Sequence, residues 1–465
     1  MDKYMYFDYM LNSKSVAIIG ASSNPEKIGY IIMKNFVSSG FNGELYPVNI
    51  KEEGEILGYK AYKSVLDIKK DIDLAVIAIP AQVVPSVLEE CGKANVKSVI
   101  VISGGFSEVG NIDLQQKLVD ISKEYNIPLL GPNCLGVMNQ KERINTLFLP
   151  TFKMDTPKIG GVSFATQSGA VGSSVLDMIA DEGFGLSKFI SYGNAADLDE
   201  CDILNYLGQD KDTKSVLFYL EGVRRGREFM EIATKVAKIK PIIAIKGGAT
   251  SAGSQAAHSH TASLAGSYEA YVAMFKQTGI IQAKSLDELL DFAKIFEAEP
   301  LAKGNRVAII TNGGGTGVLA SDAVYANGMI FPELNEESKA KLREAMPAIV
   351  NIRMPLDMAG DADEKRFGDA LEIISNDSNV DAIIVICLFQ TPGADSKVAE
   401  MLIRYNSMMK KPMVVVSAGG TYTKIHRSIM ENSGVPVYPS PERAARALAM
   451  LINYSKFKNA KIEER

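Results

Sequence analysis

Two of the chain's three histidines, His258 and His260, lie two residues apart in a segment of small residues that runs from Ser254 to Gly266. An imidazole changes protonation state near neutral pH, so it can act as a nucleophile, an acid or base, or a metal ligand. Neighbouring Ser and Thr hydroxyls can orient the ring by hydrogen bonds. The alternative is a loop whose histidines face water, and this segment alone leaves both interpretations open.

A second candidate for chemistry is Glu221, which directly follows the apolar run 215–220. A carboxylate at the carboxyl end of a buried strand can accept the N–H of an active histidine and fix its tautomer. The alternative is a surface glutamate that pairs with Arg224 or Arg225.

Two glycine-rich segments, 165–169 and 311–315, each join an apolar run to a helical pattern. Free backbone amides at a helix start bind anions, and each helix dipole contributes ~1 kcal/mol. Two such starts aimed at one point could hold a phosphoryl group on an imidazole, whereas tight strand–helix packing is the alternative for each. The candidate phosphate-binding residues are Gln167, Ser168, Gly169, Asn312, Gly313, Gly314 and Gly315.

The N-terminal block has a third loop of this kind, Gly20 to Ser23, between an apolar run and a helix. Its spacing is not GxGxxG, and the next strand ends in Asn49 followed by Lys51, where an NAD site usually has a carboxylate. An amide and a cation suit a phosphorylated ribose such as that of coenzyme A. A Rossmann-like sheet with an empty crevice is the alternative.

Short apolar runs alternate with amphipathic stretches almost throughout, which predicts an α/β fold of parallel sheets covered by helices. The rhythm breaks at 139–158 and at 297–305, where prolines interrupt it. We therefore expect domains at 1–138, 159–296 and 306–465, with a linker at 139–158. The predicted buried strands are 15–19, 44–49, 74–79, 98–102, 216–220, 242–245, 307–310, 382–386 and 413–416.

Composition bounds the class of protein. The 465 residues carry a net charge of −5, which disfavours a nucleic-acid surface, and no apolar run approaches the ~20 residues of a membrane span. The N-terminus lacks a signal-peptide pattern, so we expect a soluble cytoplasmic protein without a membrane partner. Four cysteines far apart, with no CxxC, predict buried free thiols and no metal site.

Short distinctive motifs are spread along nearly the whole chain. Among them are Ile19–Pro25, Gly104–Phe106, Gly131–Gly136, Gln167–Gly169, Glu221–Gly222, Ser259–Thr261, Asn312–Gly314 and Pro355–Asp357. With these motifs the chain resembles the alpha subunit of NDP-forming acyl-CoA synthetases, the ADP-forming acetyl-CoA synthetase group related to succinyl-CoA synthetase. It departs from the family pattern at Ala262, where Gly is common, and at Met354, where Asn is common.

The resemblance implies a Rossmann-like CoA-binding domain followed by two flavodoxin-like domains. It implies an acid–thiol ligase of the ADP-forming acetate–CoA ligase type, which interconverts acyl-CoA, ADP and phosphate with acid, ATP and CoA. His260 would carry the phosphoryl group, and Glu221 would orient the His260 ring. The loops at Ser168 and Gly313–Gly315 would bind the phosphoryl group. The residues implied for CoA are Gly20, Ala21, Ser22, Ser23, Val48, Asn49, Lys51, Ile79, Pro80, Ser103, Gly104, Phe106 and Asn133.

The resemblance also implies a partner, because we find no ATP-grasp pattern after the third block. A separate ATP-grasp beta subunit would bind ADP or ATP with Mg²⁺ in an α2β2 assembly, and the small-residue stretch 247–260 has the composition of a loop that carries phosphoryl between sites. Two rival functions stay open, a non-catalytic CoA-sensing protein and an NAD-binding oxidoreductase.

Overall fold

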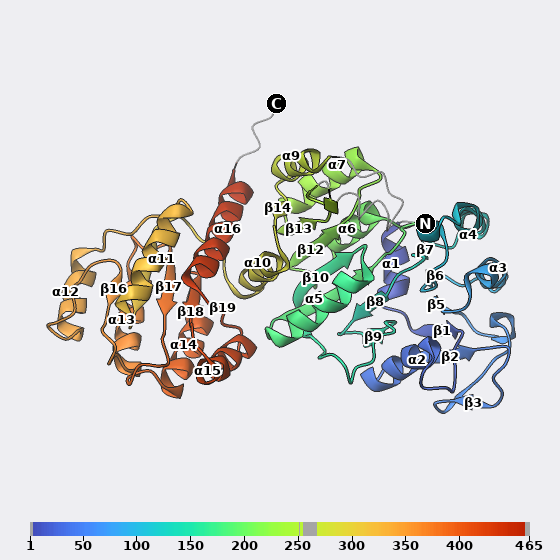
Figure 1. Ribbon diagram of the computed structural model, residues 1–465, viewed down its shortest axis with the longest axis horizontal. Helices are drawn as coiled ribbons and strands as arrows, with labels where there is room; N and C mark the ends of the chain where they lie inside the picture. The colour runs from blue at the N-terminus through green and yellow to red at the C-terminus, as the bar shows by residue number, and fades with distance from the viewer. Residues whose placement is uncertain (1–2, 251, 254–266, 461–465) are drawn as a thin grey trace. The chain divides into compact units, whose positions relative to one another are not determined.

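The computed structural model describes residues 3–250, 252–253 and 267–460. The chain divides into two compact units. Unit one comprises Met1–Asp181 and Gly185–Lys284, and unit two comprises Glu182–Phe184 and Ser285–Arg465. Figure 1 labels the elements of both units, and each unit is described by itself below.

The first sheet of unit one has the strand order β2-β1-β5-β6-β7, and all of its pairs are parallel. The strands are β1 (Ser15–Ile19), β2 (Glu44–Val48), β5 (Leu74–Ile77), β6 (Ser98–Val101) and β7 (Leu129–Leu130). Helices on both faces bury the central strands completely, which is why these strands read as unbroken apolar runs. The main helices are α2 (Ile28–Ser39), α3 (Val84–Lys93) and α4 (Ile112–Tyr125).

The strand order reverses between β1 and β5, because the chain first adds β2 on one side of β1 and then crosses to the other side. In open α/β sheets ligands bind at the carboxyl ends of the strands at such a switch point. Short elements surround this edge, namely β3 (Glu55–Ile56), β4 (Tyr59–Lys60), η1 (Val65–Asp67), η2 (Ala81–Val83) and η3 (Ser107–Val109).

The second sheet of unit one has the order β14-β13-β12-β10-β11-β8-β9. Its parallel strands are β10 (Lys158–Thr166), β11 (Gly185–Ser191), β12 (Ser215–Leu220), β13 (Ile242–Lys246) and β14 (Ile281–Gln282). Its helices include α1 (Lys3–Leu11), which packs on α6 (Glu200–Gln209), together with α5 (Gly169–Asp181), α7 (Gly226–Ala237) and α9 (Tyr268–Thr278).

Two antiparallel strands, β8 (Gly136–Asn139) and β9 (Ile144–Asn145), complete this sheet at its β11 edge. They cross the boundary predicted between residues 138 and 139, and β9 lies inside the segment predicted as a linker. A two-residue strand shows no periodicity in the sequence, so its place was set by pairing that the sequence pattern does not display.

Unit two holds one parallel sheet of order β16-β15-β17-β18-β19, made of β15 (Val307–Thr311), β16 (Leu356–Asp357), β17 (Ala382–Ile386), β18 (Met413–Val416) and β19 (Val437–Tyr438). Its helices are α10 (Leu286–Ala298), α11 (Gly314–Ala326), α12 (Glu336–Ala345), α13 (Glu364–Asn376), α14 (Ser396–Met408), α15 (Thr421–Asn432) and α16 (Pro441–Asn459). Because α10 packs on α16, it belongs to this unit although it precedes the proline-containing break at 297–305.

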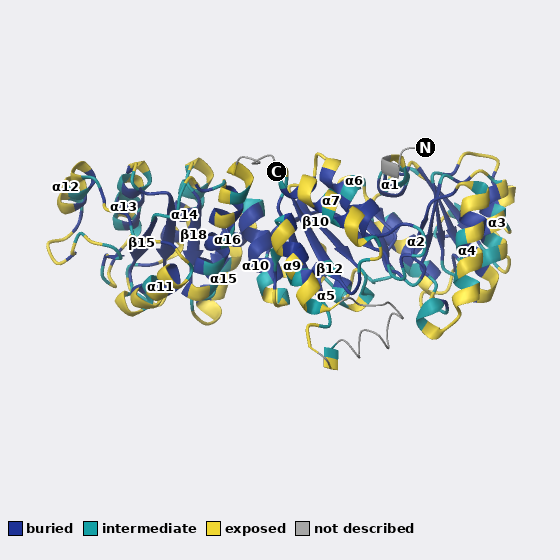
Figure 2. Ribbon diagram, turned by 90° about the horizontal axis from the view of Figure 1, so that it is seen from above, coloured by how far each residue is buried: buried dark blue, intermediate teal, exposed yellow. Residues whose placement is uncertain are grey.

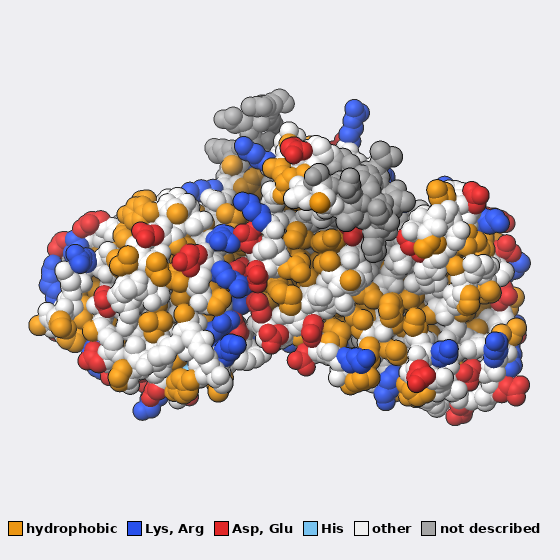
Figure 3. Space-filling view, in the orientation of Figure 1, with side chains coloured by type: hydrophobic (Ala, Val, Ile, Leu, Met, Phe, Trp, Pro, Cys, Tyr) orange, Lys and Arg blue, Asp and Glu red, His pale blue; other side chains and the backbone are white. Residues whose placement is uncertain are grey.

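Both units follow the predicted α/β pattern, with buried strands between helices whose outer faces are exposed (Figure 2). All four cysteines are free and buried, which confirms the prediction of buried thiols. Within residues 3–250, 252–253 and 267–460, no helix is both long and apolar enough to cross a bilayer. Acidic and basic side chains are interspersed over the face drawn in Figure 3.

Candidate functional site

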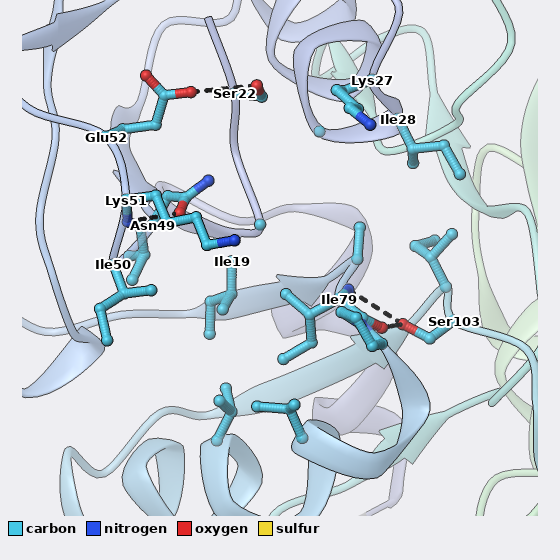
Figure 4. A pocket seen from close by; sticks show the side chains of 18 of the residues that line it. Ile19, Ser22, Lys27, Ile28, Asn49, Ile50, Lys51, Glu52, Ile79 and Ser103 are labelled. Carbon is cyan, nitrogen blue, oxygen red and sulfur yellow. Dashed lines mark hydrogen bonds between the residues drawn. The ribbon is translucent and has the colours of Figure 1, made fainter. Parts of the chain in front are cut away.

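A cavity of 1120 Å³ opens at the carboxyl ends of β1, β2, β5 and β6 in unit one (Figure 4). This is the edge at which the strand order reverses. The cavity is lined by most of the residues implied for CoA, namely Gly20, Ser22, Val48, Asn49, Lys51, Ile79, Pro80, Ser103, Gly104 and Asn133. Ala21, Ser23 and Phe106 are not among the lining residues, and Phe106 is fully buried in the hydrophobic core.

The loop after β1 approaches its neighbours too closely for any side chain. A Cβ on Gly20, whose φ is +96°, would lie 2.3 Å from the carbonyl oxygen of Ala78. A Cβ on Gly29 would lie 1.9 Å from the carbonyl oxygen of Gly20. Both positions require glycine because the start of α2 packs directly against the end of β1. Lys27 at that helix start lines the cavity, and among the described residues no side chain caps the helix there.

Asn49 connects two loops at the rim of the cavity. Its side-chain Nδ2 donates to the carbonyl oxygen of Ala21 at 2.7 Å, and its Oδ1 accepts the backbone N–H of Lys51 at 2.9 Å. Both ends of the amide are therefore engaged by the protein itself. Asn49 positions the loop, while the exposed Lys51 supplies the cation that the sequence pattern predicted.

Glu52 is a cavity residue that the sequence analysis missed. Its Oε1 accepts from Ser22 Oγ at 3.1 Å, from the backbone N–H of Ser23 at 3.0 Å and from Ser23 Oγ at 3.2 Å. The backbone N–H of Ser23 is the main cause that holds the pKa of Glu52 below its ordinary value. A carboxylate thus occupies the donors of the loop that was expected to bind phosphate.

The far wall of the cavity connects the first sheet to the second. Asn133, whose φ is +59°, donates from Nδ2 to Asn194 Oδ1 at 3.2 Å. Asn194 in turn donates to Glu108 Oε2 at 2.6 Å, and Glu108 accepts the backbone N–H groups of Gly105 and Phe106. Glu108 therefore ties the loop at Gly105 and Phe106 to Asn194, which follows β11 in the second sheet.

The loop at 167–169 places Glu221 next to a helix start. The helix α5 begins at Gly169, as predicted, and Ser168 Oγ accepts the backbone N–H of Val171 at 3.3 Å. Gln167 Oε1 accepts the backbone N–H of Glu221 and, at 2.9 Å, that of Gly222. Gln167 thus ties the loop after β10 to the loop after β12, which the sequence pattern did not show.

Glu221 itself is 9% exposed, so it is not the surface residue of the alternative interpretation. The guanidinium of Arg224 instead donates to the carbonyl oxygens of Asn194 and Ala195, at 2.7 Å and 2.6 Å. Arg225 pairs with Asp199 and Asp202. Burial of a carboxylate at the end of β12 is unfavourable because the charged group loses its hydration. Buried titratable groups of this kind are typical of functional sites.

Lys246 is a second titratable residue at this sheet edge that the sequence analysis missed. It pairs in register with Leu220, so it lies beside the strand end that precedes Glu221. Its Nζ lies 4.8 Å from the centre of the Tyr271 ring. Burial lowers the pKa of Lys246, and the charge of Glu221 opposes that shift. A carboxylate and an ammonium group thus share the carboxyl ends of β12 and β13.

His258 and His260 lie outside the described residues, in the segment between Gly253 and Ser267. That segment follows β13 in the chain and precedes α9, whose N-cap is Ser267. The assignment of His260 as the phosphorylated residue stays a prediction.

In unit two the predicted loop at 312–315 leads into α11, which begins at Gly314. Asn312 Nδ2 donates to the carbonyl oxygen of Leu388 at 3.2 Å and to Thr391 Oγ1 at 2.9 Å, while its Oδ1 accepts the N–H of Leu388 at 2.9 Å. A Cβ on Gly314 would lie 2.6 Å from Asp357 Oδ2, whereas Gly315 faces open space. The glycines thus expose the helix start, and its convergence with the α5 start in unit one stays a prediction.

Three family models match the chain. Residues 14–140 match a CoA binding domain, residues 159–296 match the succinyl-CoA ligase like flavodoxin domain, and residues 343–451 match CoA-ligase. The first match covers the sheet that carries the cavity, and the second covers the sheet that carries Glu221.

Characterised relatives and a solved structure extend the likeness to nearly the full chain. The chain is 44% identical over 97% of its length to the ADP-forming acetate–CoA ligase of Methanocaldococcus jannaschii, but it spans only 63% of that protein. It also matches the solved structure of the Korarchaeum cryptofilum dinucleotide forming acetyl-coenzyme A synthetase 1 in complex with phosphate and ADP. The likeness covers 97% of each chain, at 35% identity and a TM-score of 0.92.

Two Pyrococcus furiosus proteins match over almost their whole length. The alpha subunit of its ADP-forming acetate–CoA ligase I is 43% identical, and 99% of it is covered. The alpha subunit of ligase II is 40% identical, and 98% of it is covered. The chain therefore belongs to the family of ADP-forming acetate–CoA ligase alpha subunits.

Proposed function

We propose that this chain is the alpha subunit of an ADP-forming acyl-CoA synthetase that uses acetyl-CoA or a similar short acyl-CoA. The reaction is reversible and converts acyl-CoA, ADP and phosphate into a carboxylic acid, ATP and CoA. The observation that carries the proposal is the Gln167 contact, which fixes the backbone of the buried Glu221 beside the half-buried start of α5. Family membership supports the same activity.

The chemistry proceeds in three transfers. A phosphate oxygen attacks the thioester carbonyl, the C–S bond breaks, and CoA leaves as a thiolate that takes up a proton. A ring nitrogen of His260 then attacks phosphorus of the acyl phosphate, and the P–O bond to the acyl group breaks to release the carboxylate. Finally an oxygen of the ADP β-phosphate takes the phosphoryl group and frees the histidine.

Residues of this chain have distinct parts in that sequence. The backbone N–H groups at the start of α5 stabilise the anionic charge of the phosphoryl group as it moves. Glu221 accepts the second ring N–H of His260 and stabilises the ring when it becomes cationic. The loop Gly313–Gly315 in unit two leads into the start of α11, and we propose that it binds phosphate as well.

The cavity in the first sheet suits coenzyme A. In our proposal the loop Gly20–Ser23 faces the pyrophosphate, and Lys51 contacts the 3′-phosphate of the ribose. The exposed lysines at the rim and the glycine-dependent helix start support an anionic ligand there. An NAD site is disfavoured because the residue that follows β2 is Asn49, not a carboxylate, and its amide is engaged by the protein.

A partner is part of the proposal. We infer that ADP and Mg²⁺ bind a separate ATP-grasp beta subunit in an α2β2 assembly in the cytoplasm. The Pyrococcus furiosus relatives of full length are alpha subunits, and the longer Methanocaldococcus jannaschii relative extends beyond the matched region. The phosphoryl group would travel on the segment that carries His260.

Incubation of the purified chain with acetyl phosphate tests this function. We expect an acid-labile phosphate that mass spectrometry locates on His260, and no ATP on addition of ADP until the partner subunit is supplied. ATP synthesis by the chain alone would contradict the division of labour. CoA binding without any phosphohistidine would instead indicate a non-catalytic CoA-sensing protein.

A further inference from the structure

The donors of the Ser22–Ser23 loop are already satisfied by a carboxylate of the same chain. One oxygen of Glu52 accepts three hydrogen bonds there, two from hydroxyl groups and one from the backbone N–H of Ser23. Hydroxyl and backbone N–H donors gathered around one anionic oxygen can equally bind an oxygen of a phosphate group. Figure 4 shows Glu52 reaching toward Ser22 at the edge of the cavity.

The backbone of Glu52 is held independently of its side chain. Lys63 Nζ donates to the carbonyl oxygen of Glu52 at 2.9 Å and to that of Ile50 at 3.2 Å. The Glu52 side chain can therefore leave the loop by rotation about its own χ angles, which interconvert between staggered states, while the main chain stays in place. No unfolding of the rim is needed to free the three donors.

Two lysines at the cavity differ from the loop donors in that their ammonium groups are not engaged by the described part of the chain. Lys27 and Lys51 both line the cavity, and within the described part of the chain neither ammonium group forms a hydrogen bond or an ion pair. They are available to an incoming anion, whereas the loop donors are not. The cavity thus presents two ammonium groups next to the Ser22–Ser23 loop, whose donors already bind the Glu52 carboxylate.

We propose that Glu52 is a displaceable internal anion. Before the coenzyme binds, its carboxylate holds the donors of the Ser22–Ser23 loop, and it leaves them when a diphosphate oxygen of the coenzyme takes its place. The identity of the ligand as CoA rests on the function proposed above. By competing for the same donors, Glu52 keeps the loop in its binding geometry, weakens the affinity for CoA and speeds its release in each turnover.

The sign of the effect distinguishes this role from the obvious alternative. A glutamate that binds the ligand, for example through a ribose hydroxyl, would weaken binding when it is neutralised. A competing anion would strengthen binding when it is neutralised, because the amide holds the loop donors less tightly and no longer repels the diphosphate. Neutralisation by Glu52→Gln retains the size and the acceptor oxygen, so the loop geometry persists.

Calorimetric titration of the full chain provides the test, with Glu52→Gln compared against Glu53→Gln. Glu53 is the next residue, its side chain is 87% exposed, and it contacts Lys63 at 3.5 Å outside the loop, so it controls for the loss of one charge. We expect CoA to bind Glu52→Gln about five- to tenfold more tightly than wild type. Glu53→Gln should bind CoA as wild type does.

Titration with fragments of CoA shows which part of the ligand competes with Glu52. Dephospho-CoA, which keeps the pyrophosphate, should show the same tightening with Glu52→Gln, whereas pantetheine, which has no phosphate, should show none. Unchanged or weaker CoA binding by Glu52→Gln would overturn the displacement role while wild-type CoA binding still stands. An absence of CoA binding by wild type and all variants would overturn the proposed function, and with it this role.

Discussion

Gln167 holds the backbone of Glu221, because one side-chain oxygen accepts the N–H groups of both Glu221 and Gly222. The two loops come from strands β10 and β12, which are adjacent in the second sheet. An amide side chain thus fixes the start of the Glu221 loop through the backbone and not through the Glu221 carboxylate.

We expect Gln167→Ala to leave two backbone N–H groups without their acceptor and to lower the free energy of unfolding by about 1–3 kcal/mol. Phosphohistidine formation should fall as well, because Glu221 loses its fixed position. Urea unfolding and acetyl phosphate labelling measure the two effects. Gln209→Ala is the control, since among the described residues that exposed side chain bonds only to Asn205 within its own helix. Equal stability of the two variants would argue against the contact.

Glu221→Gln should slow phosphoryl transfer by about tenfold to a hundredfold while the protein stays folded. The physical reason is that a carboxylate stabilises a cationic imidazole through a charge-assisted hydrogen bond, and an amide does so less. Rapid-quench measurement of the acetyl phosphate half-reaction gives the rate. Transfer at the wild-type rate would remove Glu221 from the site.

His260→Ala should abolish both the phosphoenzyme and net turnover, whereas His258→Ala should leave the phosphoenzyme detectable. His260 lies between Ser259 and Thr261, as in the family motif, whereas His258 lies between Ala257 and Ser259. Mass spectrometry of the peptide after acetyl phosphate treatment distinguishes the two. The reverse pattern would move the assignment to His258.

Lys51→Ala should reduce the preference for CoA over dephospho-CoA, because the proposed contact of its ammonium group is with the 3′-phosphate. Titration of wild type and variant with both ligands measures the ratio of dissociation constants. Lys60→Ala is the control, since that ammonium group lies over the Tyr62 ring, 5.4 Å from its centre. If wild type binds both ligands equally, Lys51 does not read the 3′-phosphate.

Glu200 predicts a pH dependence of stability. Burial, followed by the charge of Asp199, raises the pKa of this fully buried carboxyl to about 7. Its unfolded value lies near 4.5, so the folded state binds the proton more tightly and stability decreases as the pH rises from about 4.5 to about 7.

Glu200→Gln should remove that dependence and gain on the order of 3 kcal/mol above pH 7, because the amide still accepts the backbone N–H of Arg224 without carrying a charge. Urea unfolding at pH 5, 6, 7 and 8 provides the measurement. An unchanged pH slope in the variant would assign the dependence to another group.

The sequence predicted those parts of the fold that a local pattern encodes. The central strands appear as continuous apolar runs because both faces of each sheet are covered, and the start of α5 at Gly169 follows from a serine and a glycine after a strand. The cavity at the end of β1 was also predictable, since parallel strands bring their carboxyl ends to one edge.

The rest depended on contacts that sequence spacing does not reveal. Glu52 meets Ser22 across 30 positions, and Gln167 meets Glu221 across 54. Their residue types fit a surface loop equally well, so only folding shows which donors each one engages. The strands β8 and β9 escaped notice for a related reason, because short edge strands are defined by their neighbours and not by a period.

The contact between Asn133 and Asn194 limits how modular this chain can be. The family models suggest a CoA-binding part that ends at residue 140 and could be exchanged as a cassette between enzymes. Excision at that point would separate Asn133 from Asn194 and would cut β8 away from β11, the strand with which it pairs. A chimaera that exchanges only residues up to 140 would therefore have to rebuild both the Asn133–Asn194 contact and the β8–β11 pairing before its cavity could take this shape.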